Sequence, residues 1–408
     1  EDPHVRDRRL DRLFTSPVTG YPFMFLLLCF IFWLTLSGAN LPSQWLSRGF
    51  DALTPHLRIV LRALSLSRNA ESLLVDGLYR TLTWVVSVML PPMAIFFPLF
   101  TLLEDSGYLP RIAFNLDHCF RRCGAHGKQA LTTCMAFGCN ACAVTGCRII
   151  ESPRERMIAI LTNALIPCNG KFATLIAILT IFFTGASGSS LLAAALLTLL
   201  ILLCFGLTLL LSALLSKTLL KGLPSAFSLE LPPYRRPQIG KVILRSVLDR
   251  TLFVLGRAVC VATPAGVLIW VLANAGILPA LTSALDPLGR LMGLDGVILA
   301  AFLLGFPANE IVIPILLMTY LSTGVLTDYT SLDQLHQLLS SHGWTNVTAL
   351  CFLLFSVAHF PCGTTCLTIY RETKSRKWTA AAVLIPTAVG TILCIAVNSL
   401  FRLWNLIL

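Results

Sequence analysis

Residues 190–216 read SLLAAALLTLLILLCFGLTLLLSALLS, an uncharged run that would make a helix apolar on every face. A helix needs about 20 mostly apolar residues to cross a bilayer, and this run is longer than that. A helix that is hydrophobic all round is buried in a large core or in a membrane. The run therefore predicts a transmembrane helix that faces lipid.

The rest of the chain has the same character. Of its 408 residues 56% are hydrophobic and 12% are charged, which is about half the charged share of a soluble domain. We therefore expect an all-α, polytopic transmembrane protein. Eight further apolar segments are expected in or across the membrane, near residues 21–41, 80–103, 130–147, 157–184, 251–275, 297–321, 347–370 and 378–404.

Basic residues indicate the orientation. They gather before residue 13, at 121–128, at 148–156, in the connector 217–250 and at 371–377, and they account for the net charge of +11 without any nucleic-acid partner. Lys and Arg favour the cytoplasmic side of short loops. We therefore expect a cytoplasmic N-terminus and an external segment at 322–346, which contains neither residue.

The chain contains an internal repeat. At an offset of 169, Leu109 matches Leu278, Asp117 matches Asp286 and Asn140 matches Asn309. At an offset of 194, ALIPCNG (164–170) matches AHFPCGT (358–364). The repeat predicts four regions: an N-terminal arm, first transmembrane helix and external amphipathic segment (1–79), a first repeat with the lipid-facing helix (80–216), a basic cytoplasmic connector (217–250), and a second repeat with a C-terminal helix (251–408).

The two repeats are expected to be inverted. If Lys128 and Arg148 both lie inside, the short segment between them cannot cross the membrane and must break or re-enter. Its counterpart near 297–321 would enter from the outside. Broken helices of inverted repeats that meet near the midplane are typical of ion-coupled transporters.

The first motif with chemical character is AFGCNACAVTGCR (136–148), which contains Cys139, Asn140 and Cys142. A thiolate beside an amide oxygen suits a borderline divalent metal better than Mg²⁺ or Ca²⁺. The alternative is a free-thiol helix packed through Gly and Ala. A single C-x-x-C does not complete a zinc site.

The second motif is IPCNGK (166–171), in which Pro167 and Cys168 precede Lys171, the one charge of residues 157–216. Proline in a helix frees a backbone carbonyl, which predicts a broken helix. The repeat copy, FPCGTTC (360–366), contains Cys362, and His359 lies just before it.

The third motif is GFPANEIVIP (305–314), where Glu310 is the only charged residue between Gly296 and Thr327. A carboxylate near the bilayer centre is expensive, which makes Glu310 a functional-site hypothesis; the alternative is a structural partner for Lys171 or a helix end. The neighbouring Asn309 matches Asn140. Glu104 and Asp105, near a predicted membrane boundary, are second-rank candidates for the cation path.

Taken together, these motifs resemble the membrane portion of the ferrous iron transport protein B family. The resemblance rests on LEDSGYLPRIAF (103–114), GCN (138–140), PRER (153–156) with PCNGK (167–171), LELPPYRRP (229–237), GFPANE (305–310) and PCGTT (361–365) with RETKSRKW (371–378). It implies two gate repeats and Fe(II) uptake across the bacterial cytoplasmic (inner) membrane. It also implies a metal path through Cys139, Cys168 and Cys362. Ala141 and Cys142 replace the usual Val-Pro, and Lys171 stands where Arg is usual.

The family also carries an N-terminal GTP-binding domain, and we expect this chain to be the membrane part alone. GAHGKQ (124–129) has the wrong spacing for a phosphate loop. GTP would therefore act only through that domain, in cis or in trans. The resemblance further implies small cytoplasmic accessory proteins, and a homo-oligomer is compatible with the sequence.

The sequence thus predicts an Fe(II) permease domain rather than an enzyme. The rival interpretations are a permease for a nucleoside or another divalent metal, an iron-binding membrane sensor, and an intramembrane thiol enzyme that uses Cys139 and Cys142. Lys171 is expected to close the path when no cation is present. The predicted metal ligands are the thiols of Cys139, Cys168 and Cys362 and the oxygens of Asn140, Asn309 and Glu310.

Overall fold

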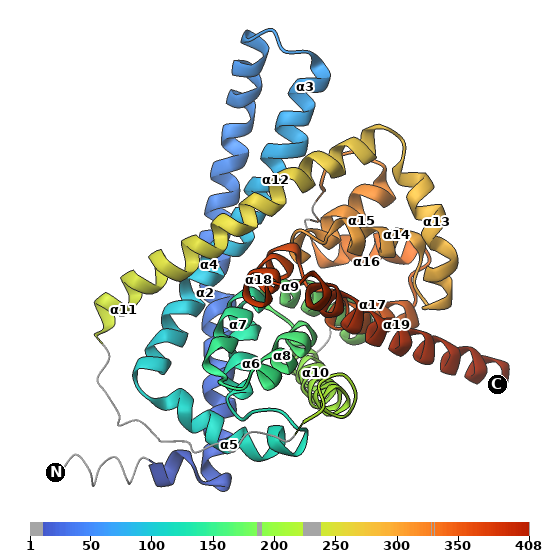
Figure 1. Cartoon of the computed structure of the whole chain (residues 1–408). Coiled ribbons are helices and arrows are strands. Elements are labelled where there is room, and N and C mark those ends of the chain that lie inside the picture. Colours follow the sequence, from blue (N-terminus) through green and yellow to red (C-terminus); the bar gives the residue numbers. More distant parts are fainter. Residues whose placement is uncertain (1–10, 186–189, 223–237, 328, 330, 408) are drawn as a thin grey trace.

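A computed structural model describes residues 11–185, 190–222, 238–327, 329 and 331–407 (Figure 1). Within these ranges every regular element is a helix, which confirms the all-α prediction. The α-helices are α2 (Pro17–Ala63), α3 (Arg68–Ser72), α4 (Arg80–Asp105), α5 (Tyr108–Arg122), α6 (Gln129–Gly138), α7 (Asn140–Gly146), α8 (Pro153–Thr162), α9 (Asn169–Leu179), α10 (Ser190–Lys217), α11 (Ile239–Arg245), α12 (Leu252–Asn274), α13 (Leu278–Leu291), α14 (Gly296–Leu304), α15 (Val312–Leu321), α16 (Leu332–Ser341), α17 (Asn346–Val357), α18 (Gly363–Thr373) and α19 (Arg376–Ile407). Short 3-10 and π-helical turns are η1 (Leu73–Tyr79), η2 (Cys147–Ile149), η3 (Asn163–Leu165), η4 (Thr180–Thr184), η5 (Ser246–Thr251) and η6 (Asn309–Ile311).

Six helices of the described chain are long and apolar enough to cross a membrane, and the number rises to eight if each sharply bent pair forms one span. The bent pairs are α13 with α14, at 112°, and α16 with α17, at 110°. The polytopic prediction is therefore confirmed. The expected nine apolar segments are not nine simple spans, because several are broken. The motif at 229–237 lies outside the described residues.

The first helix is much longer than the segment 21–41 that the sequence predicts. α2 has 47 residues and continues through Pro42 and Pro55. Each internal proline removes one backbone hydrogen bond, and close packing along α4 supports the helix past these points. At 1.5 Å per residue α2 is roughly 70 Å long, more than twice the thickness of the hydrocarbon layer. Its end therefore projects, and with α3 it forms the hairpin at the top of Figure 1.

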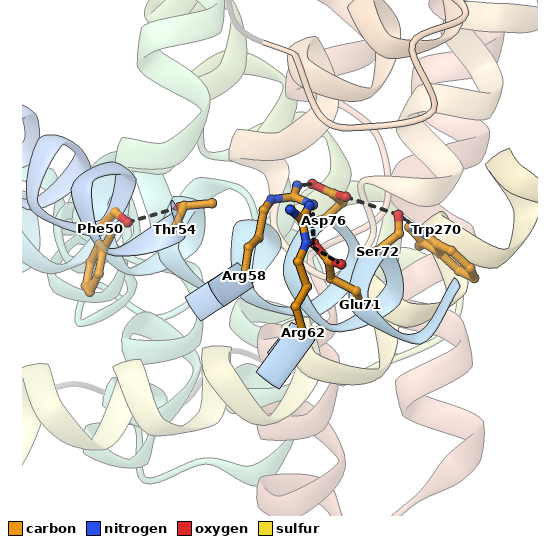
Figure 2. Close-up of polar contacts among 8 residues, drawn as sticks. All are labelled: Phe50, Thr54, Arg58, Arg62, Glu71, Ser72, Asp76 and Trp270. Carbon is orange, nitrogen blue, oxygen red and sulfur yellow. Dashed lines mark hydrogen bonds and ion pairs between the residues drawn. The ribbon is translucent and has the colours of Figure 1, made fainter. Parts of the chain in front are cut away.

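Ion pairs hold this hairpin together (Figure 2). The Arg58 guanidinium lies 3.3 Å from Glu71 Oε1 and 2.6 Å from Asp76 Oδ1. Asp76 also accepts a hydrogen bond from Ser72 Oγ, which in turn accepts one from Trp270 Nε1 of α12 at 3.0 Å. The network thus joins the projecting hairpin to the second half of the chain.

The segment 129–150 enters the protein and returns to the side from which it started. α6 and α7 pack against each other and are separated by extended backbone at Cys139. Lys128, just before α6, and Glu151, just after η2, are joined by an ion pair of 2.9 Å between Nζ and Oε1. The hydrogen bond and the charge of Lys128 hold the pKa of Glu151 below its ordinary value. Both ends of the segment therefore lie on one side of the protein, as expected for a broken or re-entrant segment.

The second repeat contains a matching re-entrant segment. Asp295 caps the N-terminus of α14, and its Oδ2 accepts a hydrogen bond of 2.5 Å from the hydroxyl of Tyr320, near the end of α15. That hydroxyl also accepts a hydrogen bond from Trp344 Nε1 at 2.9 Å. Tyr320 matches Glu151 at the repeat offset of 169. In each repeat, the residue at this position makes the contact that joins the two ends of the segment.

Backbone geometry at two glycine pairs supports the repeat. Gly107 and Gly276 have φ values of 81° and 69°, and Gly124 and Gly293 have φ values of 70° and 75°. Both pairs match at the repeat offset of 169. Only glycine adopts this region without a steric penalty, which explains why glycine stands at both places in each copy.

The two repeats interlock at their broken helices. α7 of the first repeat packs against α18 of the second, and α9 of the first packs against η6 of the second. At the repeat offsets α9 corresponds to α18, and α7 corresponds to η6 and the start of α15. The contact of α7 with α18 is therefore equivalent to the contact of η6 with α9. Buried apolar residues from both repeats form one continuous core around them. The arrangement brings four irregular segments to one place.

Candidate functional site

A small cavity of about 30 Å³ lies where the broken helices of the two repeats meet. This is room for about one or two water molecules. Helix ends and the breaks beside them, at 138–140, 168–170, 307–310 and 362–365, surround the cavity, and α4 closes it. Its lining includes all six predicted ligands: Cys139, Asn140, Cys168, Asn309, Glu310 and Cys362.

Cys139 and Asn140 mark the break of the first re-entrant segment. The Cys139 side chain is buried, and its backbone is extended between two helices. The Asn140 amide fits its surroundings when Nδ2 donates to the carbonyl oxygens of Ala136 at 3.1 Å and Ile166 at 3.3 Å.

Cys168 and Asn309 meet across the repeat interface. Asn309 Nδ2 approaches Cys168 Sγ to 4.0 Å. Asn309 Oδ1 is buried and accepts no hydrogen bond from the described part of the protein. A buried polar atom without a partner costs free energy, so this oxygen is suited to accept a donor or to bind a cation.

Cys362 stands at the equivalent break of the second repeat. Its Sγ lies 3.2 Å from Thr365 Oγ1. The next residue, Gly363, donates its backbone N–H to the carbonyl oxygen of Phe306 at 2.6 Å. This bond fixes the start of α18 against the irregular backbone between α14 and η6.

Lys171 lies beside the cavity, fully buried in the first turns of α9. Its Nζ has no hydrogen-bond partner among the described residues. The thiols of Cys168, Cys204 and Cys362 lie within electrostatic range of Lys171. Within the described structure no ion pair joins Lys171 to Glu310, so the alternative in which these two residues are structural partners finds no support.

The remaining sequence candidates do not line the cavity. The His359 ring packs among Phe302, Phe355 and Phe360, and Nδ1 contacts the carbonyl oxygen of Ser356 at 2.8 Å. Its Nε2 is buried and has no hydrogen-bond partner in the described ranges. Cys142 interacts with Cys139 one helical turn away. Glu104 and Asp105 are exposed at the C-terminal end of α4.

Sequence reasoning missed Met89 and Met93, which lie one helical turn apart on α4 and line the cavity. Residues at this spacing share one face of a helix. Methionine in an apolar span looks like ordinary core, so these two carried no signal of their own. The pair Pro91–Pro92 between them marks an unusual stretch of helix and could have drawn attention to it.

The cavity does not form a closed metal site in this conformation. Across the described residues, no three His, Cys, Asp or Glu side chains converge closely enough to hold a metal ion. Each thiol and the carboxylate come from a different segment, and amide and thioether side chains line the same cavity. Thiols, amides and a carboxylate together suit a borderline divalent metal such as Fe(II).

Comparison with known families identifies the two halves of the repeat. The Gate family, described as nucleoside recognition, matches residues 86–183 and 255–376, which together make up more than half of the chain. The family described as the ferrous iron transport protein B C terminus matches residues 197–250. The two Gate matches confirm that the chain contains two copies of one unit.

Relatives with curated names match almost the whole chain. The Fe(2+) transporter FeoB of Staphylococcus aureus (strain MSSA476) is 28% identical over 412 residues, which cover 96% of this chain and 59% of the relative. The Fe(2+) transporter FeoB of Methanocaldococcus jannaschii is 27% identical over 383 residues, with 87% and 54% covered. A Porphyromonas gingivalis relative, named as a fusion of Fe(2+) transport protein A and FeoB, is 26% identical over 427 residues, with 92% and 49% covered.

The chain therefore spans about half the length of these relatives. No solved structure shows a significant match. Two Gate units, the C-terminal family segment and the interlocked breaks at Cys139 and Cys168 agree with one another. The chain belongs to the ferrous iron transport protein B family, of which it forms the membrane portion.

Proposed function

We propose that this chain forms the Fe(II) pathway of a ferrous iron uptake transporter in the bacterial cytoplasmic membrane, with its N-terminus on the cytoplasmic side. One observation carries the proposal: the six residues that the sequence singles out as metal ligands line one cavity between the two repeats. They come from four segments that are far apart in the chain. Shared hydrophobicity does not explain such a convergence.

The donor set supports Fe(II) as the cargo. Thiolates are soft ligands, whereas amide and carboxylate oxygens are hard, and a mixture suits borderline divalent metals. A transport site must also release its ion, so binding has to be weaker than in a structural site. Donors that are spread over four segments meet this requirement. Only some of these donors would bind Fe(II) at any one time.

The interlocked repeats support alternating access. A movement of α9 changes its contact with η6, and an equivalent movement of α18 changes its contact with α7. In inverted-repeat transporters, such paired contacts open one side of a central site while closing the other. Lys171 supports a closed state without cargo, because its buried ammonium supplies a positive charge beside the thiols.

A GTP-binding domain, in cis or in trans, would regulate this pathway rather than form part of it. The named fusion of Fe(2+) transport protein A with a FeoB relative supports a small cytoplasmic partner. Basic residues near the cytoplasmic ends of the helices support the proposed orientation.

The second candidate, a nucleoside permease, derives its support from the description of the Gate family. Sites for molecules of that size usually enclose roughly 300 Å³ or more. The cavity between the repeats has about 30 Å³. At the cavity that the six predicted ligands line, this size favours a small ion over an organic solute.

The test is anaerobic flux into liposomes that contain the 408-residue chain, measured for Fe(II), Mn(II), Zn(II) and uridine. We expect Fe(II) to enter and Cys139→Ser to reduce its rate by roughly tenfold or more, the range seen when metal-binding groups are altered. The matched control is Cys260→Ser, since Cys260 is exposed on α12 and does not line the cavity.

Each other outcome selects a rival. Uridine flux without Fe(II) flux would support the nucleoside permease. Fe(II) binding without flux, even after the GTP-binding domain is supplied, would support a sensor. Exchange of the free Cys139 and Cys142 thiols with an added disulfide, which is reduced to its dithiol while Cys139 and Cys142 form a disulfide, without flux, would support a thiol enzyme.

A further inference from the structure

A second, larger cavity lies next to the one between the repeats. Its volume is about 260 Å³, and Asn40 and Ser43 of α2, Trp84 of α4 and Tyr329 are among the residues that line it. We call it the vestibule, and we call the smaller cavity between the repeats the central cavity. Tyr329 belongs to the segment that the charge pattern predicts to be external. With that orientation, the vestibule lies on the external side, from which an ion taken up by the cell would approach.

The two cavities share three lining residues, which are Asn169, Gly170 and Glu310. They come from the first turn of α9 and from η6, and these two elements pack against each other. The boundary between the vestibule and the central cavity is thus made by one contact between the repeats.

The Glu310 side chain rests directly on Gly170. A Cβ atom placed on Gly170 would overlap Glu310 Oε1 and Cδ. Gly170 lies in helix α9 and does not have a positive φ, so the backbone conformation does not demand glycine there. Glycine is needed there because the Glu310 carboxylate occupies the position that a Cβ atom would take. The first turn of a helix also favours a nearby carboxylate through the helix dipole.

The equivalent contact in the other half has no charge. The repeat offsets pair Glu310 with Ala141 and Gly170 with Thr364. Thr364 lines the central cavity but not the vestibule. The two sides of the central cavity therefore differ, because among its described lining residues the carboxylate belongs to Glu310, on the side toward the vestibule.

We propose that the Glu310 carboxylate, seated on Gly170, is the partition between the vestibule and the central cavity. A divalent cation that arrives in the vestibule binds the carboxylate, draws it off Gly170 and so opens the way to Cys168. The identification of that cation as Fe(II) rests on the proposed function, whereas the partition itself does not.

Cysteine labelling tests the partition without any transport. Cys139, Cys168 and Cys362 line the central cavity, whereas the described lining of the vestibule contains no cysteine. Ser43→Cys adds a reporter to the vestibule. Liposomes are treated from the vestibule side with a membrane-impermeant, cationic methanethiosulfonate, and the modification of each cysteine is followed by peptide mass spectrometry.

We expect Glu310→Ala to raise the rate of modification at Cys168 by about tenfold or more, because access limits the reactivity of a buried thiol. The rate at the Ser43→Cys reporter should stay unchanged, which also shows that the variant is folded. Equal rates at Cys168 with and without the Glu310 side chain would overturn the proposal.

Gly170→Ala provides a second test that keeps the carboxylate. The added methyl group displaces Glu310 from its seat, so Cys168 should again be modified faster. The matched control is Ala173→Ser, because Ala173 lies on the same helix and lines the vestibule but not the central cavity. A faster modification of Cys168 in both Gly170→Ala and Ala173→Ser would show general loosening of α9 and would also overturn the proposal.

The two proposals fail separately. If the unaltered chain moves no Fe(II) but Glu310→Ala exposes Cys168, the partition stands and the proposed cargo is wrong. If Fe(II) is transported while Cys168 is equally reactive in both proteins, the cargo stands and the partition is wrong.

Discussion

Cys139 and Ala308 have almost the same backbone conformation, although they belong to different repeats. Their φ and ψ angles are −155° and 123° for Cys139 and −152° and 124° for Ala308. Each residue lies at the extended break of a re-entrant segment, and both line the central cavity. The repeat thus places a thiol on one side of the cavity and a methyl group on the other.

Ala308→Cys should turn the central cavity into a tighter site for thiophilic metals. The new thiol would occupy the position equivalent to Cys139, and soft ligands select Zn(II) over harder cations. We expect Zn(II) affinity to rise by roughly tenfold or more, measured by competition with a chromogenic chelator. Ala308→Ser is the matched control, since it adds an oxygen of similar size. A similar gain with serine would contradict a role for the thiol.

Lys171→Met should strengthen cation binding and stabilise the protein. The ammonium of Lys171 is buried without a hydrogen-bond partner in the described ranges, and a charge at membrane depth is costly. Its removal also ends the repulsion of an incoming cation. We expect Mn(II), used as an air-stable probe, to bind about tenfold more tightly, with a higher melting temperature.

The control for that experiment is Lys217→Met, because Lys217 is exposed at the end of α10. It should change neither quantity. Weaker Mn(II) binding in Lys171→Met would mean that Lys171 organises the site instead of competing for it.

Tyr320→Phe should destabilise the second re-entrant segment. The change removes the hydrogen bond to Asp295 and leaves the indole N–H of Trp344 without its acceptor. Hydrogen bonds to charged groups contribute roughly 1.5–3 kcal/mol, and we expect a loss of that order in unfolding by a denaturing detergent. Glu151→Gln is the comparison in the first repeat.

The Glu151 carboxylate is 86% exposed in its ion pair with Lys128, and exposed pairs contribute little to stability. Unfolding of Glu151→Gln should therefore match that of the unaltered chain. Equal losses in the two variants would show that the part-buried bond at Tyr320 contributes no more to stability than the exposed ion pair.

Gly266→Ala should disturb the crossing of α12 over the projecting hairpin. A Cβ at Gly266 would lie 2.5 Å from the carbonyl oxygen of Gly77 and 2.9 Å from Thr81. Overpacking of this kind costs about 1–3 kcal/mol, which detergent unfolding can measure. Gly256→Ala, on the same helix, has nothing within 4 Å of the new atom and should be neutral. If both variants unfold alike, the crossing is not tightly packed.

Much of the site could be predicted because its residues conflict with their surroundings. Pro167 breaks an apolar run, and Glu310 is a charge where charges are costly. The repeat offset then paired Asn140 with Asn309 before any geometry was known. These signals survive in a single sequence because lipid exposure penalises every exception.

The parts that escaped prediction depend on packing. Met89 and Met93 are indistinguishable from core residues until α4 is placed against the breaks. The length of α2 was missed because Pro42 and Pro55 look like helix ends, whereas packing along α4 keeps the helix continuous. The contact between Glu310 and Gly170 joins two motifs from different repeats, and neither motif alone indicates that the two residues meet.

The interlocking of α7 with α18 has a consequence for biosynthesis. Cys139 leaves the ribosome long before α18 is made, and its backbone N–H and carbonyl oxygen are already paired within the first repeat, with Met135 and Ala143. The first re-entrant segment can therefore form before α18, but the residues of α18 that line the central cavity are still missing at that stage. The central cavity is completed only after translation has passed α18, so a chain truncated before Gly363 has no path to offer, whatever helices it has already inserted.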